Sequence, residues 1–168
     1  DPDKIALYGE GTGGYVALAY GTLDKNEEMD LEKFRVQGTG PSYINRSLVG
    51  EIDGSGGVLN LYESSSTSTE VSAIVAAGGA LADTSWLEAG DAPMISFHSV
   101  RDAFAPFSEG TVIVPTTNED VVDVQGGNVY IQKANNLGNN DAIKNIASND
   151  PYTTAARALY GETVDYIY

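Results

Sequence analysis

The stretch KIALYGEGTGGYVALAYGTL, residues 4–23, decides the fold of this chain. Ile5 to Tyr8 is a short apolar run between turn-forming residues, which predicts a buried strand of a parallel sheet covered on both faces. After a glycine-rich turn, the apolar residues from Val16 to Leu23 have the spacing of a helix of about two to three turns. They occupy most sides of that helix, so we expect it to be packed deep. The stretch predicts a strand, a tight turn and a helix.

Composition limits the possible classes of protein. The 168 residues, 42% of them hydrophobic, are enough for one compact domain, 1–168, with its own core. Lys and Arg total 9 against 24 Asp and Glu, and the net charge of -15 argues against nucleic acid and membrane insertion as modes of interaction. The absence of cysteine excludes disulfides, thiolate catalysis and a cysteine-bound zinc. No transmembrane run is visible, and because a strand is predicted almost at the first residue, we expect upstream sequence to be missing.

The rest of the chain alternates apolar runs with loops and helical segments. Residues 71–81 and 92–100 predict two more buried strands, with a short helix or turn carrying the single tryptophan between them. Residues 24–57 read as a surface connection, 110–138 mix β-branched runs with a short helix, and the C-terminal residues predict one or two helices. This order indicates an α/β fold with a mostly parallel sheet flanked by helices.

The glycine-rich turn allows a nucleotide-binding interpretation. Gly9, Gly11 and Gly14 have the G-x-G-x-x-G spacing that lets a pyrophosphate approach a helix N-terminus. Asp30 or Glu32 could hold the ribose. Glu10, however, places a carboxylate where the phosphates would lie, and no cofactor is predicted.

The same turn resembles the nucleophile elbow of α/β-hydrolases. Residues 1–23 are similar to the family segment in which Asp-Pro-x-Arg/Lys precedes the strand and the turn reads Gly-x-Ser-x-Gly-Gly. The family's serine falls on Gly11, and Thr12 is one place late. Residues 71–107 are similar to the family's next two strands, and FHSVRDAFAPF, residues 97–107, resembles the turn that supplies the catalytic acid, at Asp102. The chain also resembles hydrolase-like proteins secreted by Bacteroidetes-type bacteria.

This resemblance implies the C-terminal portion of an α/β-hydrolase-like fold, with two of three catalytic positions empty. Gly11 cannot attack a carbonyl, and no histidine follows Asp102 to act as a base. The only histidine, His98, is a weak candidate, because it can equally be a core histidine bonded to the backbone. Thr12 is another weak candidate with Glu10 as its base, or it caps the helix. Asp102 could instead pair with Arg101 or cap a turn.

The sequence therefore predicts a non-catalytic, degenerate hydrolase-like domain of a secreted or cell-surface protein that binds or assembles with a protein partner or the rest of its own polypeptide. The alternative is a fragment of an active esterase or acyl hydrolase whose missing catalytic residues lie outside this chain. The acidic segments 24–30 and 117–123 are candidates for a divalent cation, although a solvated charged surface explains them as well.

Overall fold

The computed structural model describes residues 4–59, 68–144 and 166–167. Clustering of the backbone divides the chain into two compact units. The first comprises residues 1–22 and 71–168, and the second comprises residues 23–70. All three segments that the sequence analysis assigned to the sheet belong to the first unit.

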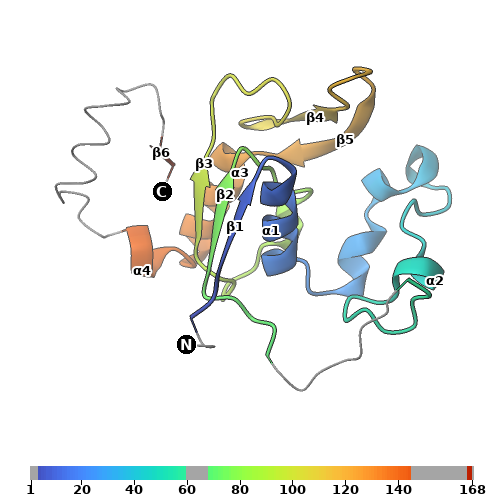
Figure 1. The fold of residues 1–168 in the computed structure, drawn as a ribbon, viewed down its shortest axis with the longest axis horizontal. Helices are drawn as coiled ribbons and strands as arrows, with labels where there is room; N and C mark the ends of the chain where they lie inside the picture. Colours follow the sequence, from blue (N-terminus) through green and yellow to red (C-terminus); the bar gives the residue numbers. More distant parts are fainter. Residues whose placement is uncertain (1–3, 60–67, 145–165, 168) are drawn as a thin grey trace. The chain divides into compact units, whose positions relative to one another are not determined.

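The first unit contains a parallel sheet with helices against it (Figure 1). Its strands β1 (Ala6–Glu10), β2 (Ala73–Ala77) and β3 (Met94–Phe97) pair in parallel and in sequence order. The short β6 (Tyr166–Ile167) pairs antiparallel with β3 at the edge. The expectation of an α/β fold with a mostly parallel sheet is confirmed at this level.

Helices α1 (Thr12–Thr22) and α3 (Gly127–Leu137) lie on the same face of the sheet. A β-carbon at Gly21 of α1 would meet the side chain of Ile74, and one at Gly127 of α3 would meet the side chain of Ser96. Ser96 is the registered partner of Ala76, two residues from Ile74, so these side chains project from one face. We call this face the covered face.

The opposite face of the sheet is much less buried. It carries Tyr8, Val75, Ile95 and Phe97, and Tyr8 is 66% exposed. Val75 and Ile95 are half-buried, whereas Ile74 and Met94, their neighbours in sequence, are fully buried on the covered face. We call this second face the open face.

Close backbone contacts hold α1 against the sheet. Its sequence contains three glycines, which would weaken a helix in isolation. Two of them lie where the helix approaches the sheet: the Cα of Gly79 is 3.0 Å from where a β-carbon of Gly14 would stand, and Gly21 contacts Ile74. Packing, rather than intrinsic propensity, therefore accounts for α1.

Helix α3 packs on β3 through Tyr130, Ile131 and Ala134, all fully buried. The hydroxyl of Tyr130 donates to Oγ of Ser96 at 2.7 Å. Gly138 ends the helix in the left-handed conformation, with a φ of 83°. Beyond it, the buried side chain of Asn140 accepts the amide hydrogen of Met94 at 2.8 Å and so joins the end of α3 to the start of β3.

A two-stranded antiparallel ribbon, β4 (Glu109–Ile113) and β5 (Asp120–Gln125), follows the turn after β3. Reciprocal backbone hydrogen bonds between Leu81 and Gln125 attach β5 to the segment after β2. The short 3-10 helix η4 (Thr84–Trp86) lies in that segment and buries the tryptophan, as expected of a short helix or turn. Helix α4 (Asp141–Lys144) follows α3.

The second unit is built from short helical turns: η1 (Asn26–Asp30), η2 (Glu32–Phe34), η3 (Val36–Gly38) and α2 (Arg46–Val49). Arg46 pairs with Asp30 at 2.8 Å and with Glu51 at 3.2 Å. The carboxylate of Glu28 accepts the backbone amides of Asp24 and Lys25, both at 3.0 Å. Local polar contacts thus organise a segment that the sequence indicated as a connection.

Two expectations about burial were wrong. Strand β1 lies at an edge of the described sheet, and its pattern is mostly exposed, because β2 pairs with one side of it and its open-face side chains are accessible. Helix α1 is buried on one side only: Val16 is 64% exposed and Tyr20 is 52% exposed. Of the C-terminal helices predicted, most residues lie outside the described ranges. Among the described helices, none is long and apolar enough to cross a lipid bilayer.

Candidate functional site

The turn between β1 and α1 consists of one residue, Gly11. Its φ of 53° lies in the left-handed region that side chains with a β-carbon rarely adopt. Its amide donates to the carbonyl of Ala77 at 2.8 Å, which fixes the turn to the end of β2. A β-carbon at Gly11 would meet no atom within 4 Å, so a side chain there would project into open space. The chain thus passes from strand to helix through a single residue, in a conformation that glycine adopts without strain.

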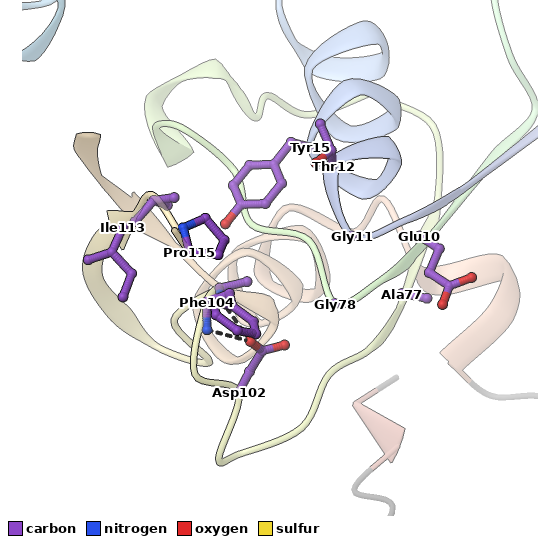
Figure 2. A pocket seen from close by; sticks show the side chains of 12 residues that line it. Glu10, Gly11, Thr12, Tyr15, Ala77, Gly78, Asp102, Phe104, Ile113 and Pro115 are labelled. Atoms are coloured by element: carbon purple, nitrogen blue, oxygen red, sulfur yellow. Dashed lines mark hydrogen bonds between the residues drawn. The ribbon is translucent and has the colours of Figure 1, made fainter. Parts of the chain in front are cut away.

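A cleft of about 450 Å³ opens beside this turn, at the carboxyl ends of β1 and β2 (Figure 2). Four of its lining residues carry polar side chains: Glu10, Thr12, Tyr15 and Asp102. The others are apolar or lack a side chain, namely Gly11, Ala77, Gly78, Phe104, Ala105, Val112, Ile113 and Pro115. The carboxyl edge of a parallel sheet is where α/β folds place their ligand sites, and this cleft falls within the usual size of such sites.

Tyr15, one helical turn after Gly11, has a buried hydroxyl in this cleft. Figure 2 shows the ring leaving the first turn of α1, with the hydroxyl directed toward Pro115. The oxygen is inaccessible to solvent and has no hydrogen-bond partner among the described residues. Burial, and then the negative charge of Asp102, raise the pKa of this phenol. The hydroxyl therefore stays protonated at neutral pH.

Asp102 organises the loop after β3. Its Oδ1 accepts the amides of Phe104 at 2.8 Å and Ala105 at 2.9 Å, so the carboxylate caps this turn, as one of the two sequence alternatives proposed (Figure 2). Its Oδ2 lies 3.8 Å from Nε2 of His98, which is too long for a hydrogen bond. One carboxylate oxygen is thus committed to the backbone, and the side chain remains 21% exposed at the cleft.

His98 is a structural histidine. Its Nδ1 accepts the amide hydrogen of Gly127 at 3.2 Å, and since a backbone amide can only donate, the ring proton resides on Nε2. Nε2 then donates to the carbonyl of Ala105 at 2.9 Å. The ring packs edge-on against Phe107, with centroids 5.7 Å apart, and the side chain has no exposed surface. The interpretation as a core histidine bonded to the backbone is confirmed.

Thr12 lines the cleft but does not act as the helix cap that the sequence suggested. Helix α1 begins at Thr12 itself, so Gly11 occupies the preceding position. Glu10, the base that a reactive Thr12 would need, ends β1 and lies at the opposite end of the cleft from Ile113 (Figure 2). The structure brings together Gly11, Thr12 and Asp102 and leaves His98 beneath them in the core.

The nucleotide and metal interpretations gain no support from the geometry. Asp30, offered for a ribose, lies in the second unit and forms ion pairs with Arg35 and Arg46. Within the described ranges, no three acidic or histidine side chains gather in a way that could hold a metal ion. The acidic segment 117–123 instead runs into β5, where Asp123 accepts the hydroxyl of Thr111.

Comparison with protein-family models, curated proteins and solved structures gives no significant match. The coarse class is therefore defined by the fold and cleft alone: an α/β domain with a ligand-sized cleft at the carboxyl edge of its parallel sheet.

Sequence reasoning missed most of the apolar and aromatic lining of the cleft, including Tyr15, Ile113 and Pro115. Tyr15 carried a usable signal, because it lies four residues after Gly11 and so one helical turn above the elbow. Ile113 and Pro115 carried none, since the fold of the β4–β5 ribbon alone brings them to the turn.

Proposed function

We propose that this chain is the C-terminal portion of an α/β-hydrolase-like domain that has lost catalysis and uses its cleft to bind a ligand or partner, in a secreted or cell-surface protein. The fold supports the proposal through a parallel sheet in sequence order, an elbow turn after one strand and a cleft carboxylate after the third. The extracellular setting rests on the sequence resemblance.

One observation carries the loss of catalysis. The elbow position is Gly11, which has no nucleophilic atom, and the only histidine of the chain has both ring nitrogens bonded to the backbone. Acyl transfer by a serine-type mechanism needs an activated hydroxyl and a base that can accept its proton. Thr12 does not replace them, because a carboxylate such as that of Glu10 is a poor acceptor of a proton from an alcohol.

A second candidate function is an active acyl hydrolase completed by residues from outside this chain. Two features favour it: Gly11 keeps the elbow backbone, and Asp102 keeps an accessible carboxylate at the same cleft. A nucleophile and a histidine would have to be supplied to this edge of the sheet by another segment or subunit.

Labelling with a fluorophosphonate probe separates the two candidates. The protein is purified from its source, treated with the probe beside a known serine esterase, and analysed by peptide mass spectrometry. We expect the esterase to be labelled and this protein to stay unmodified, because no activated serine is present. A stoichiometric adduct on the native protein that heat denaturation prevents would instead establish the acyl hydrolase.

A further inference from the structure

The polar atoms of the cleft are mainly hydrogen-bond acceptors. Asp102 and Glu10 contribute carboxylates, and none of the lining residues is Lys, Arg or His. Because Oδ1 of Asp102 is occupied by two backbone amides, Oδ2 is the oxygen left for a ligand. A molecule that fills this cleft must therefore donate hydrogen bonds to it.

The rest of the wall is apolar and partly aromatic. Figure 2 shows the rings of Tyr15 and Phe104 on the side of the cleft formed by Ile113 and Pro115, with the carboxylate of Asp102 beside Phe104. Aromatic faces attract organic cations, and aliphatic walls bury an apolar body. The lining thus suits a ligand with a small apolar body and a charged donor at one end.

Electrostatics favours a cation over an anion despite the nearby helix end. The N-terminus of α1 contributes about half a positive charge, which alone would favour an anion. Two carboxylates line the same cleft, however, and the chain carries a net charge of -15. The full negative charges outweigh the partial positive charge, and the surrounding field enriches cations at the cleft.

The buried hydroxyl of Tyr15 is a second polar group at this cleft, and it has no hydrogen-bond partner among the described residues. A polar atom that has lost water without gaining a partner is unfavourable, and such atoms are uncommon in folded proteins. Its oxygen can accept a hydrogen from a ligand that enters beside Pro115 and shifts the end of β4. An ammonium group has three hydrogens, enough for this hydroxyl and for the carboxylate of Asp102.

We propose that the cleft binds an organic ammonium ion, a primary amine attached to a small apolar body, through Asp102, the hydroxyl of Tyr15 and the ring of Phe104. This assignment rests on the proposed binding function and adds the chemical class of the ligand.

Calorimetric titration of the full chain at neutral pH and low salt, with benzylamine, benzyl alcohol and benzoate as probes, tests this assignment. The three share one ring and differ in the charge of the end group. We expect benzylamine to bind at least about tenfold more tightly than the other two, and its affinity to fall as salt screens the carboxylates. Equal affinity for benzoate, or no binding of benzylamine, would overturn the ammonium assignment.

Three variants test whether benzylamine binds at this cleft. Asp102→Asn keeps an oxygen for the turn amides and removes the charge, and we expect benzylamine affinity to fall at least about tenfold. Asp120→Asn, the same change on exposed β5, should leave it unchanged. Phe104→Leu, at an exposed ring, should weaken it roughly threefold and guards against a folding defect in the asparagine variant. Unchanged affinity in both cleft variants would contradict the assignment.

The two experiments separate the class of ligand from the loss of catalysis. If the benzylamine titration fails while fluorophosphonate labelling stays negative, the ligand class is wrong and the non-catalytic function stands. If labelling is positive, the proposed function is wrong whatever the amine does.

Discussion

The two faces of the parallel sheet differ in what lies against them. On the covered face, Ile74 and Met94 are fully buried. A β-carbon at Gly9 of β1 would overlap the backbone of α1, and one at Gly127 of α3 would overlap the side chain of Ser96 on β3. On the open face, Tyr8 and Phe97 remain exposed. Parallel sheets are ordinarily buried on both sides, so stability within the described residues must come largely from one face. The cleft lies at the carboxyl ends of β1 and β2, beside the turn at Gly11.

The largest effect should come from adding one methyl group to the covered face. A β-carbon at Gly9 would overlap the carbonyl of Gly13, a backbone atom that cannot move without shifting α1. We expect Gly9→Ala to lower the free energy of unfolding by about 4 kcal/mol, measured by urea denaturation.

The matched control is Gly13→Ala, where no atom lies within 4 Å of the new β-carbon. This change should be neutral or stabilise α1 by roughly 0.5–1 kcal/mol. Similar losses in both variants would show that α1 does not rest on β1 as described.

Truncating an isoleucine on each face compares the two faces directly. Ile74 is fully buried on the covered face and Ile95 is half-buried on the open face. We expect Ile74→Ala to cost about 3 kcal/mol and Ile95→Ala about 1 kcal/mol in urea denaturation, since buried area and residual cavity set the penalty. If Ile95→Ala costs as much as Ile74→Ala, the open face is covered in solution.

Alkaline pH should lower the free energy of unfolding through Tyr130, which packs against the covered face. Burial raises the pKa of Tyr130 to about 12 from its usual value of 10.0. The unfolded chain then ionises first, so stability is intact below about pH 10 and is lost as pH rises toward 12, by about 2–3 kcal/mol.

Urea unfolding at neutral pH and at about pH 11.5 measures this loss. Tyr130→Phe should remove most of the alkaline loss, at a cost of about 1 kcal/mol at neutral pH because Ser96 loses its partner. Tyr8→Phe, an exposed tyrosine on the open face, should keep the parental pH dependence. If Tyr130→Phe loses as much stability at alkaline pH as the parent, the ionisation of Tyr130 is not the cause of that loss.

The smallest expected change in the free energy of unfolding comes from Tyr15, which lines the cleft. Tyr15→Phe removes a buried hydroxyl without a partner and should raise the free energy of unfolding by about 1 kcal/mol. Tyr20→Phe, on the same helix but 52% exposed, should change it by less than about 0.5 kcal/mol. Thermal denaturation without ligand compares the pair, and destabilisation by Tyr15→Phe would mean that its hydroxyl is satisfied in solution.

The sequence predicted the order of strands but not the asymmetry of the sheet. The strands β1, β2 and β3 were predicted from short apolar runs bordered by glycine or proline, and α1 was predicted from the helical spacing of its apolar residues. The strand AIVAA of β2, however, is apolar at every position, so its alternating burial left no trace in residue type. An exposed β1 could not be predicted for the same reason.

For the site, local patterns predicted the residues close to each turn. The glycine spacing located Gly11, and the segment after β3 located Asp102 and the backbone-bonded His98. The aromatic and aliphatic wall brings together residues about a hundred positions apart, such as Tyr15 and Pro115, and no local pattern encodes this.

The central claim is that this cleft binds a ligand without catalysis. The rate of p-nitrophenyl acetate hydrolysis tests it most directly, measured for the protein purified from its source and for the variant Gly11→Ser. The account predicts that both rates equal that of buffer, because the variant regains a hydroxyl but His98 remains bonded to Gly127 and Ala105. Saturable turnover by the native protein, or its appearance in Gly11→Ser, would contradict the claim and show that a working base reaches the cleft.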